Sequence, residues 1–250
     1  MTVETDEDEH RRAQISNPGR QPGPAQLTIA PTCFRTAASR CTSLTFASYL
    51  MGKPTHSLSP VACPARLTSP CSSHRRDVQI VPILVGSIST SAEGAFGKLL
   101  APYLASPTTL FVISSDFCHW GTRFRYTHYS DPHNGPVSLG RGTTPAQDHP
   151  IHESIKDLDR KGMDAIAFGG EGGKTAGEAH DAFAGYLDET KNTICGRHPI
   201  GVLLGAVKEL EEGGGEGGGL ELEWTRYEQS SACLTVKDSS VSYASAVVTK

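Results

Sequence analysis

The composition of the chain changes abruptly near residue 77, and this change limits how much of the chain can fold. Residues 11–76 are rich in Pro, Ser, Thr and Arg and show no sustained helical or strand period. Such a stretch buries too little apolar surface to offset its conformational entropy, so we expect it to be disordered or poorly packed. Apolar segments with a clear period begin at Val78. We therefore expect the globular part of the chain to be residues 77–250.

The segments after residue 77 alternate between strand and helix patterns. The apolar runs at 78–85 and 109–113 predict buried strands, and the apolar stripe of residues 91–105 predicts a helix between them. Two buried strands joined by a helix are normally parallel, with a right-handed crossover. The sequence therefore predicts an α/β fold with a largely parallel or mixed central sheet flanked by helices.

The rest of the globular part is predicted to be helical with two closing strands. A loop rich in Gly, Pro and His runs from residue 126 to 150 and is longer than most connections in compact domains. The glycine-rich run 212–219 is typical of a flexible linker. The helices are expected at 151–168, 177–191 and 199–212, and the strands at 220–227 and 241–248.

Charge and cysteine usage exclude several classes of protein. The 23 basic and 27 acidic side chains are scattered along the chain, so no basic face is predicted for nucleic acid. No apolar run approaches the roughly 18 to 20 residues that a membrane span needs. Seven cysteines without a C-x-x-C pair indicate neither a disulfide framework nor a zinc ribbon. The acidic N-terminus is unlike a secretory signal, so a cytoplasmic location is expected.

The best candidate site follows the predicted strand at 109–113. Residues 114–120 bring a carboxylate, a thiol and an imidazole together at a strand end, where polar side chains can converge outside the core. Asp116 and His119 could share a metal, or the carboxylate could orient the imidazole and leave His119 as an acid/base group. The alternative is structural: Asp116 caps a turn and His119 bonds to the backbone.

Two further polar turns contain candidate binding residues. In the turn 192–199, Arg197 stands at a predicted helix N-terminus, where the guanidinium and free N–H groups suit an anion. The alternative is that Arg197 and His198 only satisfy neighbouring carbonyls. In the turn 227–233, Cys233 lies beside two hydroxyls, although a lone cysteine is more often a small buried hydrophobe than a ligand.

Several motifs, in this order, are similar to those of the Memo family. They lie at residues 81–86, 115–126, 192–201, 229–231 and 238–244, so the resemblance covers roughly residues 77–250. Residues 1–10 contain a shorter segment that resembles a preceding part of the family domain. The resemblance implies a partial fold of the class III extradiol dioxygenase type that lacks the first half of its domain. It also implies that residues 11–76 are foreign to the fold and that the lost strands leave apolar surface uncovered.

The resemblance also implies roles for single residues. His119 matches the histidine that acts as acid/base beside bound oxygen in the dioxygenase relatives, and Asp116 lines the same pocket. Cys233 matches the family's cysteine, which stands where the dioxygenases have a glutamate ligand, and His10 resembles a pocket histidine. The family's two other metal histidines, in Pro-His-Ala-Gly-Tyr and Ser-His-His contexts, have no match here. The implied metal site, with His119, Cys233 and His10, is therefore incomplete.

Two functions follow from the resemblance. The first is an iron- or copper-linked redox role on a small-molecule substrate, impaired by the missing histidines, because mixed His and Cys ligands suit these metals. The second is a non-catalytic adaptor that binds phosphotyrosine peptides of receptor kinases and influences cell motility. In an adaptor, Arg197, His198 or Arg123 would hold the phosphate.

Overall fold

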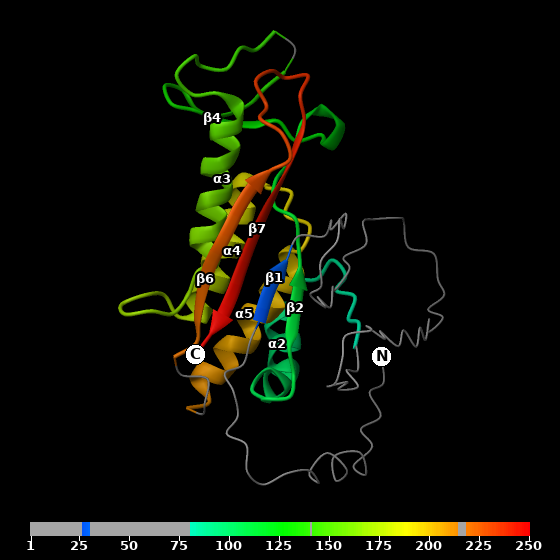
Figure 1. Ribbon diagram of the computed structural model, residues 1–250, viewed down its shortest axis with the longest axis vertical. Helices are drawn as coiled ribbons and strands as arrows, with labels where there is room; N and C mark the ends of the chain where they lie inside the picture. The colour runs from blue at the N-terminus through cyan, green and yellow to red at the C-terminus, as the bar shows by residue number, and fades with distance from the viewer. Residues whose placement is uncertain (1–26, 31–80, 141, 215–218) are drawn as a thin grey trace, which may run out of the picture.

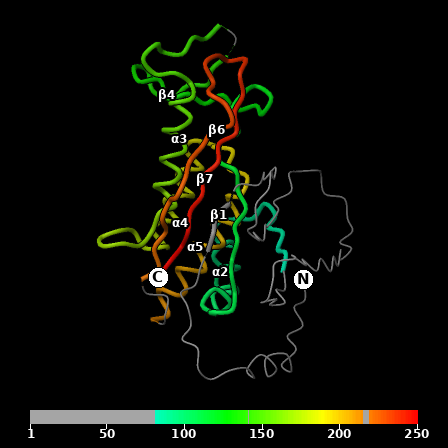
Figure 2. Tube along the Cα trace, viewed as in Figure 1, coloured from blue at the N-terminus to red at the C-terminus, as the bar shows by residue number. Residues whose placement is uncertain are grey.

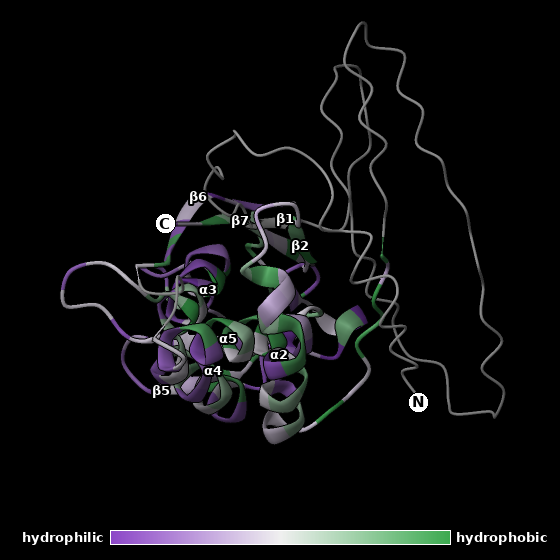
Figure 3. Cartoon of the chain, turned by 90° about the horizontal axis from the view of Figure 1, so that it is seen from below, coloured by the Kyte–Doolittle hydropathy of each residue, from purple (hydrophilic) through white to green (hydrophobic). Residues whose placement is uncertain are grey.

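The structure is a computed structural model. It describes the backbone of residues 27–30 and the residues 81–140, 142–214 and 219–250. Figure 1 shows a central sheet with the long helices packed behind it, and Figure 3 shows that these helices lie together on one face of the sheet. The described part of the chain therefore combines helices and a sheet, as the sequence predicts, in two layers with the helices on one face.

The main sheet is mixed and mostly antiparallel. β1 (Leu27–Ala30) pairs with β2 (Phe111–Ser114) in parallel, and on its other edge it pairs with β7 (Ser240–Thr249) in antiparallel orientation. β7 also pairs antiparallel with β6 (Glu221–Gln229) and, near its start, with β3 (His119–Trp120). The prediction of a largely parallel sheet is therefore wrong: among the described strands, β1 and β2 form the one parallel pair.

The strand predicted at 78–85 is not found in the described residues. Residues 81–86 have no regular structure, and Val81 and Leu84 are 69% and 73% exposed. Pro82 has no N–H to donate to a strand ladder, which is one physical reason that the apolar run does not pair. The remaining residues of the predicted strand, 78–80, lie outside the described part.

β1 takes the place that the sequence assigned to the 78–85 strand. It comes from residues 11–76, which were predicted to be disordered or poorly packed, and its backbone is in register with β2 from Leu27 opposite Phe111 to Ala30 opposite Ser114. A four-residue strand between Pro24 and Pro31 is too short to show a period of its own. Residues 1–10 and the rest of 11–76 lie outside the described residues.

The four predicted helices are confirmed to within a few residues. They are α2 (Thr90–Leu104), α3 (Ile151–Ile166), α4 (Ala176–Thr190) and α5 (Arg197–Glu212). α4 begins with a capping box between Thr175 and Glu178, which satisfies N–H groups at the helix start. The loop predicted at 126–150 contains a small hairpin of β4 (His128–Asp131) and β5 (Gly135–Ser138). Among the described residues, no helix is long and apolar enough to cross a membrane.

The core lies between the sheet and the helix layer. α3 presents Ile151, Ile155, Leu158 and Ile166 at helical spacing, and each of these side chains is buried. Phe117, two residues before β3, and Trp120, the second residue of β3, are fully buried in the same core. The chain on either side of His119 is thus fixed by packing, which limits how far the imidazole can move.

α2 and α5 cross closely because glycines replace side chains at their contact. A Cβ on Gly97 would lie 2.5 Å from the backbone nitrogen of Ala206, whereas a Cβ on Gly94 would meet no atom within 4 Å. We expect Gly97→Ala to lower the free energy of unfolding by about 1 to 3 kcal/mol through overpacking. Gly94→Ala, the matched control, is expected to raise the free energy of unfolding by about 0.5 to 1 kcal/mol. Urea unfolding of both variants tests this, and equal effects would contradict it.

Candidate functional site

The segment 115–120 leaves β2 and runs along the first half of β7. The Phe117 N–H donates to the Ser242 carbonyl and the Ser242 N–H donates to the Cys118 carbonyl, each at 2.9 Å. His119 and Trp120 then pair with β7 as the short strand β3. Figure 2 shows this trace continuing beside β7 away from β1. The predicted site segment is therefore held as part of the sheet, with Asp116 and His119 on its polar side.

The ring of His119 is oriented by the loop before α5. Its Nδ1 lies 3.1 Å from the Thr193 carbonyl oxygen, which can only accept, so Nδ1 carries a proton. The Thr193 hydroxyl also accepts from the His119 N–H at 2.7 Å. The other ring nitrogen, Nε2, lies 3.8 Å from Oδ2 of Asp116, and both side chains are 15% exposed. The structure thus brings the two predicted catalytic residues together, with Nε2 facing the carboxylate.

Cys195 lies beside Asp116, although the two residues are 79 positions apart in the sequence. The Asp116 N–H donates to Sγ of Cys195 at 2.9 Å, and the Cys195 N–H donates to the Asp116 carbonyl at 3.2 Å. Next to them, the Gly196 N–H donates to Oγ of Ser115 at 3.0 Å. A Cβ on Gly196 would lie 2.4 Å from Cβ of Ser115, so only glycine allows this close approach.

The buried carboxylate of Asp159 joins the two segments that form this site, which are residues 115–120 and the loop before α5. Asp159 of α3 is fully buried, and its Oδ1 accepts from the Cys118 N–H at 3.3 Å and from the Asn192 side chain at 3.1 Å. Its Oδ2 accepts from the Tyr227 hydroxyl at 2.9 Å. Burial raises the pKa of Asp159 to about 6, although hydrogen bonds from Ser242, Tyr227, Asn192 and Cys118 oppose the shift. Asp159 therefore ties the β3 segment to the loop that orients His119.

Cys233 lies in the core near Cys118, close enough for the two thiols to interact. Its side chain is fully buried in the core, and burial raises the pKa of its thiol to about 11. Its carbonyl accepts from the N–H of His152 at 3.1 Å, at the start of α3. No hydrogen bond or ion pair among the described residues joins Cys233 to His119. Cys118, also buried, has its pKa raised by burial and by the charge of Asp159, so both thiols are protonated at neutral pH.

The predicted anion-binding residues are not grouped in one place. Arg123 lies in the turn Thr122–Phe124, with its guanidinium carbon 4.3 Å from the ring centre of Phe124. The Phe124 ring meets the His119 ring edge-on, at 5.3 Å between centres, so Arg123 is near the candidate site. Arg197 is the first residue of α5. His198 instead donates a hydrogen bond from Nδ1 to Glu93.

Glu93 of α2 lies between two histidines. It accepts from Nδ1 of His198 at 2.6 Å and from Nε2 of His180 at 2.8 Å, and its side chain is 10% exposed. Gly201 makes room for it, because a Cβ there would lie 2.2 Å from a Glu93 carboxylate oxygen. These contacts join α2, α4 and α5. His198 thus pairs with a carboxylate and not with a neighbouring carbonyl, and its buried Nε2 has no hydrogen-bond partner among the described residues.

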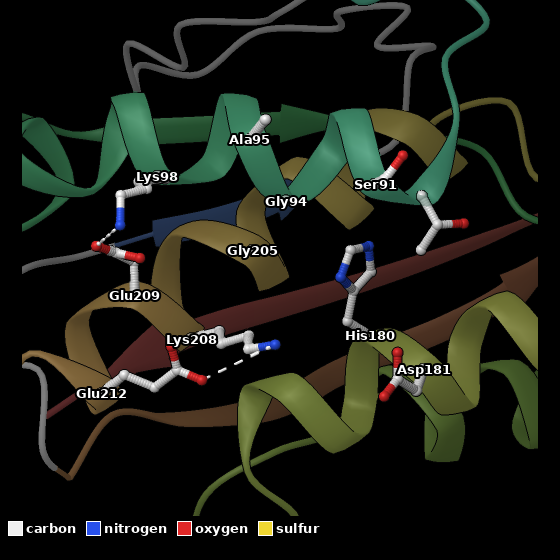
Figure 4. Close-up of a pocket in the computed structure, with 11 residues that line it drawn as sticks. Ser91, Gly94, Ala95, Lys98, His180, Asp181, Gly205, Lys208, Glu209 and Glu212 are labelled. Atoms are coloured by element: carbon white, nitrogen blue, oxygen red, sulfur yellow. Dashed lines mark ion pairs between the residues drawn. The ribbon is translucent and has the colours of Figure 1, made fainter.

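A pocket of about 400 Å³ lies where α2, α4 and α5 meet (Figure 4). It shares no lining residue with the site around His119. Lys98 pairs with Glu209 at 2.8 Å and Lys208 lies 3.9 Å from Glu212, so both lysines at this pocket are neutralised. The pocket therefore has no excess positive charge for an anion.

The implied metal site is not complete in the described residues. No group of three or more His, Cys, Asp or Glu side chains within them is placed to hold a metal ion. His10 lies outside the described residues. Asp116, His119 and Cys195 are neighbours without forming such a group, so the residues of this half do not by themselves fit a metal.

Comparison with known proteins gives the family. The family model described as Memo-like protein matches residues 67–247, more than half of the chain. The chain belongs to the Memo family. It is 48% identical over 174 residues to Protein MEMO1 of Xenopus tropicalis and 44% identical over 179 residues to Protein MEMO1 of Homo sapiens. It is also 36% identical over 183 residues to the MEMO1 family protein MHO1 of Saccharomyces cerevisiae. The resemblance seen in the sequence motifs is confirmed.

The match covers most of this chain but about half of each relative. The alignments span 69% of this chain and 49% of the Xenopus tropicalis protein, 71% and 50% for the human protein, and 69% and 52% for the yeast protein. The chain therefore spans about half the length of the Memo-family relatives it matches. What a whole Memo-family protein does can therefore only be proposed for this chain.

Two residues of the site were not singled out by the sequence. Cys195 was noted only as part of the turn 192–199, and its meeting with Asp116 depends on how the loop crosses the β3 segment. Asp159 offered a signal that was overlooked: it is a carboxylate on the apolar stripe of α3, next to Leu158. A charged residue at a core position is rarely buried without partners.

Proposed function

We propose that Asp116, His119 and Cys195 are this chain's part of a metal-linked redox site of the Memo family. The observation that carries the proposal is the contact of the Asp116 N–H with Sγ of Cys195, beside a histidine whose ring is held by a backbone carbonyl. Histidines that bind metals commonly donate their second ring N–H to such an oxygen. Thiolate and imidazole ligands suit copper and iron.

The described residues do not complete the site. They offer no three-ligand group, so the remaining ligands have to come from outside the described part of the chain or from another polypeptide. A bound iron or copper would supply one-electron redox chemistry, and this chain's own residues would orient the site.

The alternative role for His119 is proton transfer at Nε2, which excludes coordination of a metal by the same nitrogen. Nδ1 donates to the Thr193 carbonyl, so Nε2 is the nitrogen that gains or loses a proton. Oδ2 of Asp116 lies 3.8 Å from Nε2, so the carboxylate faces this nitrogen. A positioned imidazole of this kind is the usual general acid or base near neutral pH.

Metal titration of the full-length chain tests the assignment. Dissociation constants for Cu(I) and Fe(II), measured under anaerobic conditions against a competing chelator, are expected to rise about tenfold or more in Cys195→Ser and in His119→Ala. Cys233→Ser is the matched control and is expected to leave affinity unchanged, provided that circular dichroism shows a folded protein. Equal affinity of the wild type and a His119→Ala, Cys195→Ser double variant would contradict the proposal. Weakening by Cys233→Ser alone would favour the ligand set inferred from the sequence.

The adaptor role is the second candidate. It is favoured by the position of Arg123, whose guanidinium lies near the candidate site at the Phe124 ring. It is disfavoured at the turn before α5, because His198 already donates to Glu93. Binding of a phosphotyrosine peptide, like the cytoplasmic location, stays a prediction from the family resemblance.

A further inference from the structure

His180 of α4 is a buried histidine with one ring nitrogen open to a ligand. Its side chain is 8% exposed, and Nε2 lies 2.8 Å from a carboxylate oxygen of Glu93. A carboxylate only accepts, so Nε2 carries the proton and Nδ1 of the neutral ring is an acceptor. Nδ1 has no hydrogen bond with the described residues, yet it is not among their buried unpaired atoms, so it is accessible.

This nitrogen lies at the pocket between α2, α4 and α5. Figure 4 shows the His180 ring pointing from α4 into the pocket, toward Gly94 of α2 and Gly205 of α5. A Cβ on Gly94 would meet no atom within 4 Å, so the space in front of that glycine is empty. The pocket volume of about 400 Å³ is enough for a small molecule. A ligand of few atoms can therefore reach Nδ1.

Glu93 fixes the ring in the tautomer that leaves Nδ1 without a proton. Its side chain is 10% exposed and also accepts from Nδ1 of His198 at 2.6 Å, so both histidines direct a ring N–H toward it. The two histidines come from α4 and α5, and the carboxylate between them comes from α2. Contacts among three helices thus present Nδ1 of His180 to the pocket as an acceptor.

The unpaired charge at this pocket is negative. The pocket is lined by three acidic and two basic side chains. Lys98 pairs with Glu209, and Lys208 lies 3.9 Å from Glu212. Asp181, the residue after His180, lines the same pocket (Figure 4) and has no ion pair within the part of the chain that the structure describes. An acceptor nitrogen and an unpaired carboxylate therefore face the same space, which favours a cation that can donate hydrogen bonds.

We propose that this pocket binds a small organic ammonium ion. An ammonium group carries both a positive charge and N–H donors. In the complex, one N–H donates to Nδ1 of His180, and Asp181 balances the charge. The hydrocarbon part of the ligand lies in the empty space at Gly94. The pocket shares no lining residue with the site around His119, so the inference does not rest on the proposed redox function.

Three small probes test the proposal on the full-length chain without added metal. n-Butylammonium and tetramethylammonium are isomers with the same charge, but only the first has N–H donors, whereas n-butanol has a donor and no charge. At pH 8, where imidazole is ordinarily neutral, n-butylammonium is expected to move the nitrogen NMR signal of Nδ1 of His180 in a saturable way. The other two probes are expected to bind about tenfold more weakly or worse, because each lacks one of the two interactions. The signal is assigned by its loss in His180→Gln.

Variants locate the binding in this pocket. Asp181→Asn, and Gly94→Leu, which fills the empty space, are each expected to raise the dissociation constant of n-butylammonium about tenfold or more. The matched controls on α4 are Asp188→Asn, whose side chain is 86% exposed, and Gly185→Leu, where a Cβ also meets no atom within 4 Å. Neither control residue lines the pocket, and both variants are expected to leave the dissociation constant unchanged. Circular dichroism checks that each variant is folded.

Three outcomes would overturn the proposal. They are the absence of a saturable shift at His180, equal affinity for the two isomeric cations, and an unchanged affinity in either folded pocket variant. Equal affinity for the isomers would show that charge alone attracts the cation. An unchanged affinity in Gly94→Leu would show that the cation binds elsewhere on the chain.

Discussion

Replacing Asp159 with alanine is expected to lower the free energy of unfolding by about 3 to 5 kcal/mol at pH 7. The substitution leaves the Cys118 N–H and the Asn192 amide without their acceptor, and also the Tyr227 hydroxyl. Each buried donor without an acceptor costs about 1 to 3 kcal/mol. Removing the carboxylate also removes its own desolvation cost, which offsets part of the loss but not all of it.

Urea unfolding of the full-length chain measures this effect. Asp164→Ala is the matched control, because Asp164 lies on the same helix with its side chain in solvent, and its change is expected to stay within about 0.5 kcal/mol. Because Asp159 ties the β3 segment to the loop at Asn192, the Asp159→Ala variant is also expected to lose order around His119. A loss of stability no greater than that of Asp164→Ala would show that the network contributes little.

The second large effect is a dependence of the free energy of unfolding on pH, which Asp159→Asn is expected to remove. The pKa of Asp159 is about 6 in the folded chain, above its ordinary value of 3.8. A group whose pKa is raised by folding stabilises the fold at acid pH, and this stabilisation is lost as the pH rises through the folded value. The wild type is therefore expected to lose about 2.4 kcal/mol from this group between pH 4 and pH 7.

Comparing the two proteins isolates this effect, since every other titrating group is common to both. The free energy of unfolding of Asp159→Asn minus that of the wild type is expected to rise by about 2.4 kcal/mol from pH 4 to pH 7. Urea unfolding at four pH values across this window measures the difference. A difference that does not change with pH, or that falls, would show that burial does not raise the pKa of the Asp159 carboxyl.

The buried network around Asp159 also involves two tyrosines and Asn192. Burial raises the pKa of Tyr227, as does the charge of Asp159, and burial raises that of Tyr186, so both hydroxyls remain donors. Tyr186 accepts from the second N–H of Asn192 at 2.7 Å, so the amide is held from two sides. The side-chain oxygen Oδ1 of Asn192 accepts from the Thr193 N–H, which helps to position the Thr193 carbonyl that orients His119.

Local pattern determined the helices and the strand-end position of the candidate site. The amphipathic stripe of α3 and the capping box at Thr175 and Glu178 involve residues a few positions apart, so their periods and chemistry are visible in the chain itself. The alternation of β7 has the same origin. The placement of Asp116 and His119 directly after a buried strand also followed from order along the chain.

The tertiary structure alone decided which distant residues meet. The position of β1 between β2 and β7 depends on backbone pairing between segments more than 80 residues apart, and a four-residue strand carries too little pattern to predict it. The same holds for Cys195 beside Asp116 and for Asp159 behind Cys118, because each contact joins segments that only folding brings together. Sequence period reports on which face of an element is apolar, whereas the partner of that face is chosen by packing in three dimensions.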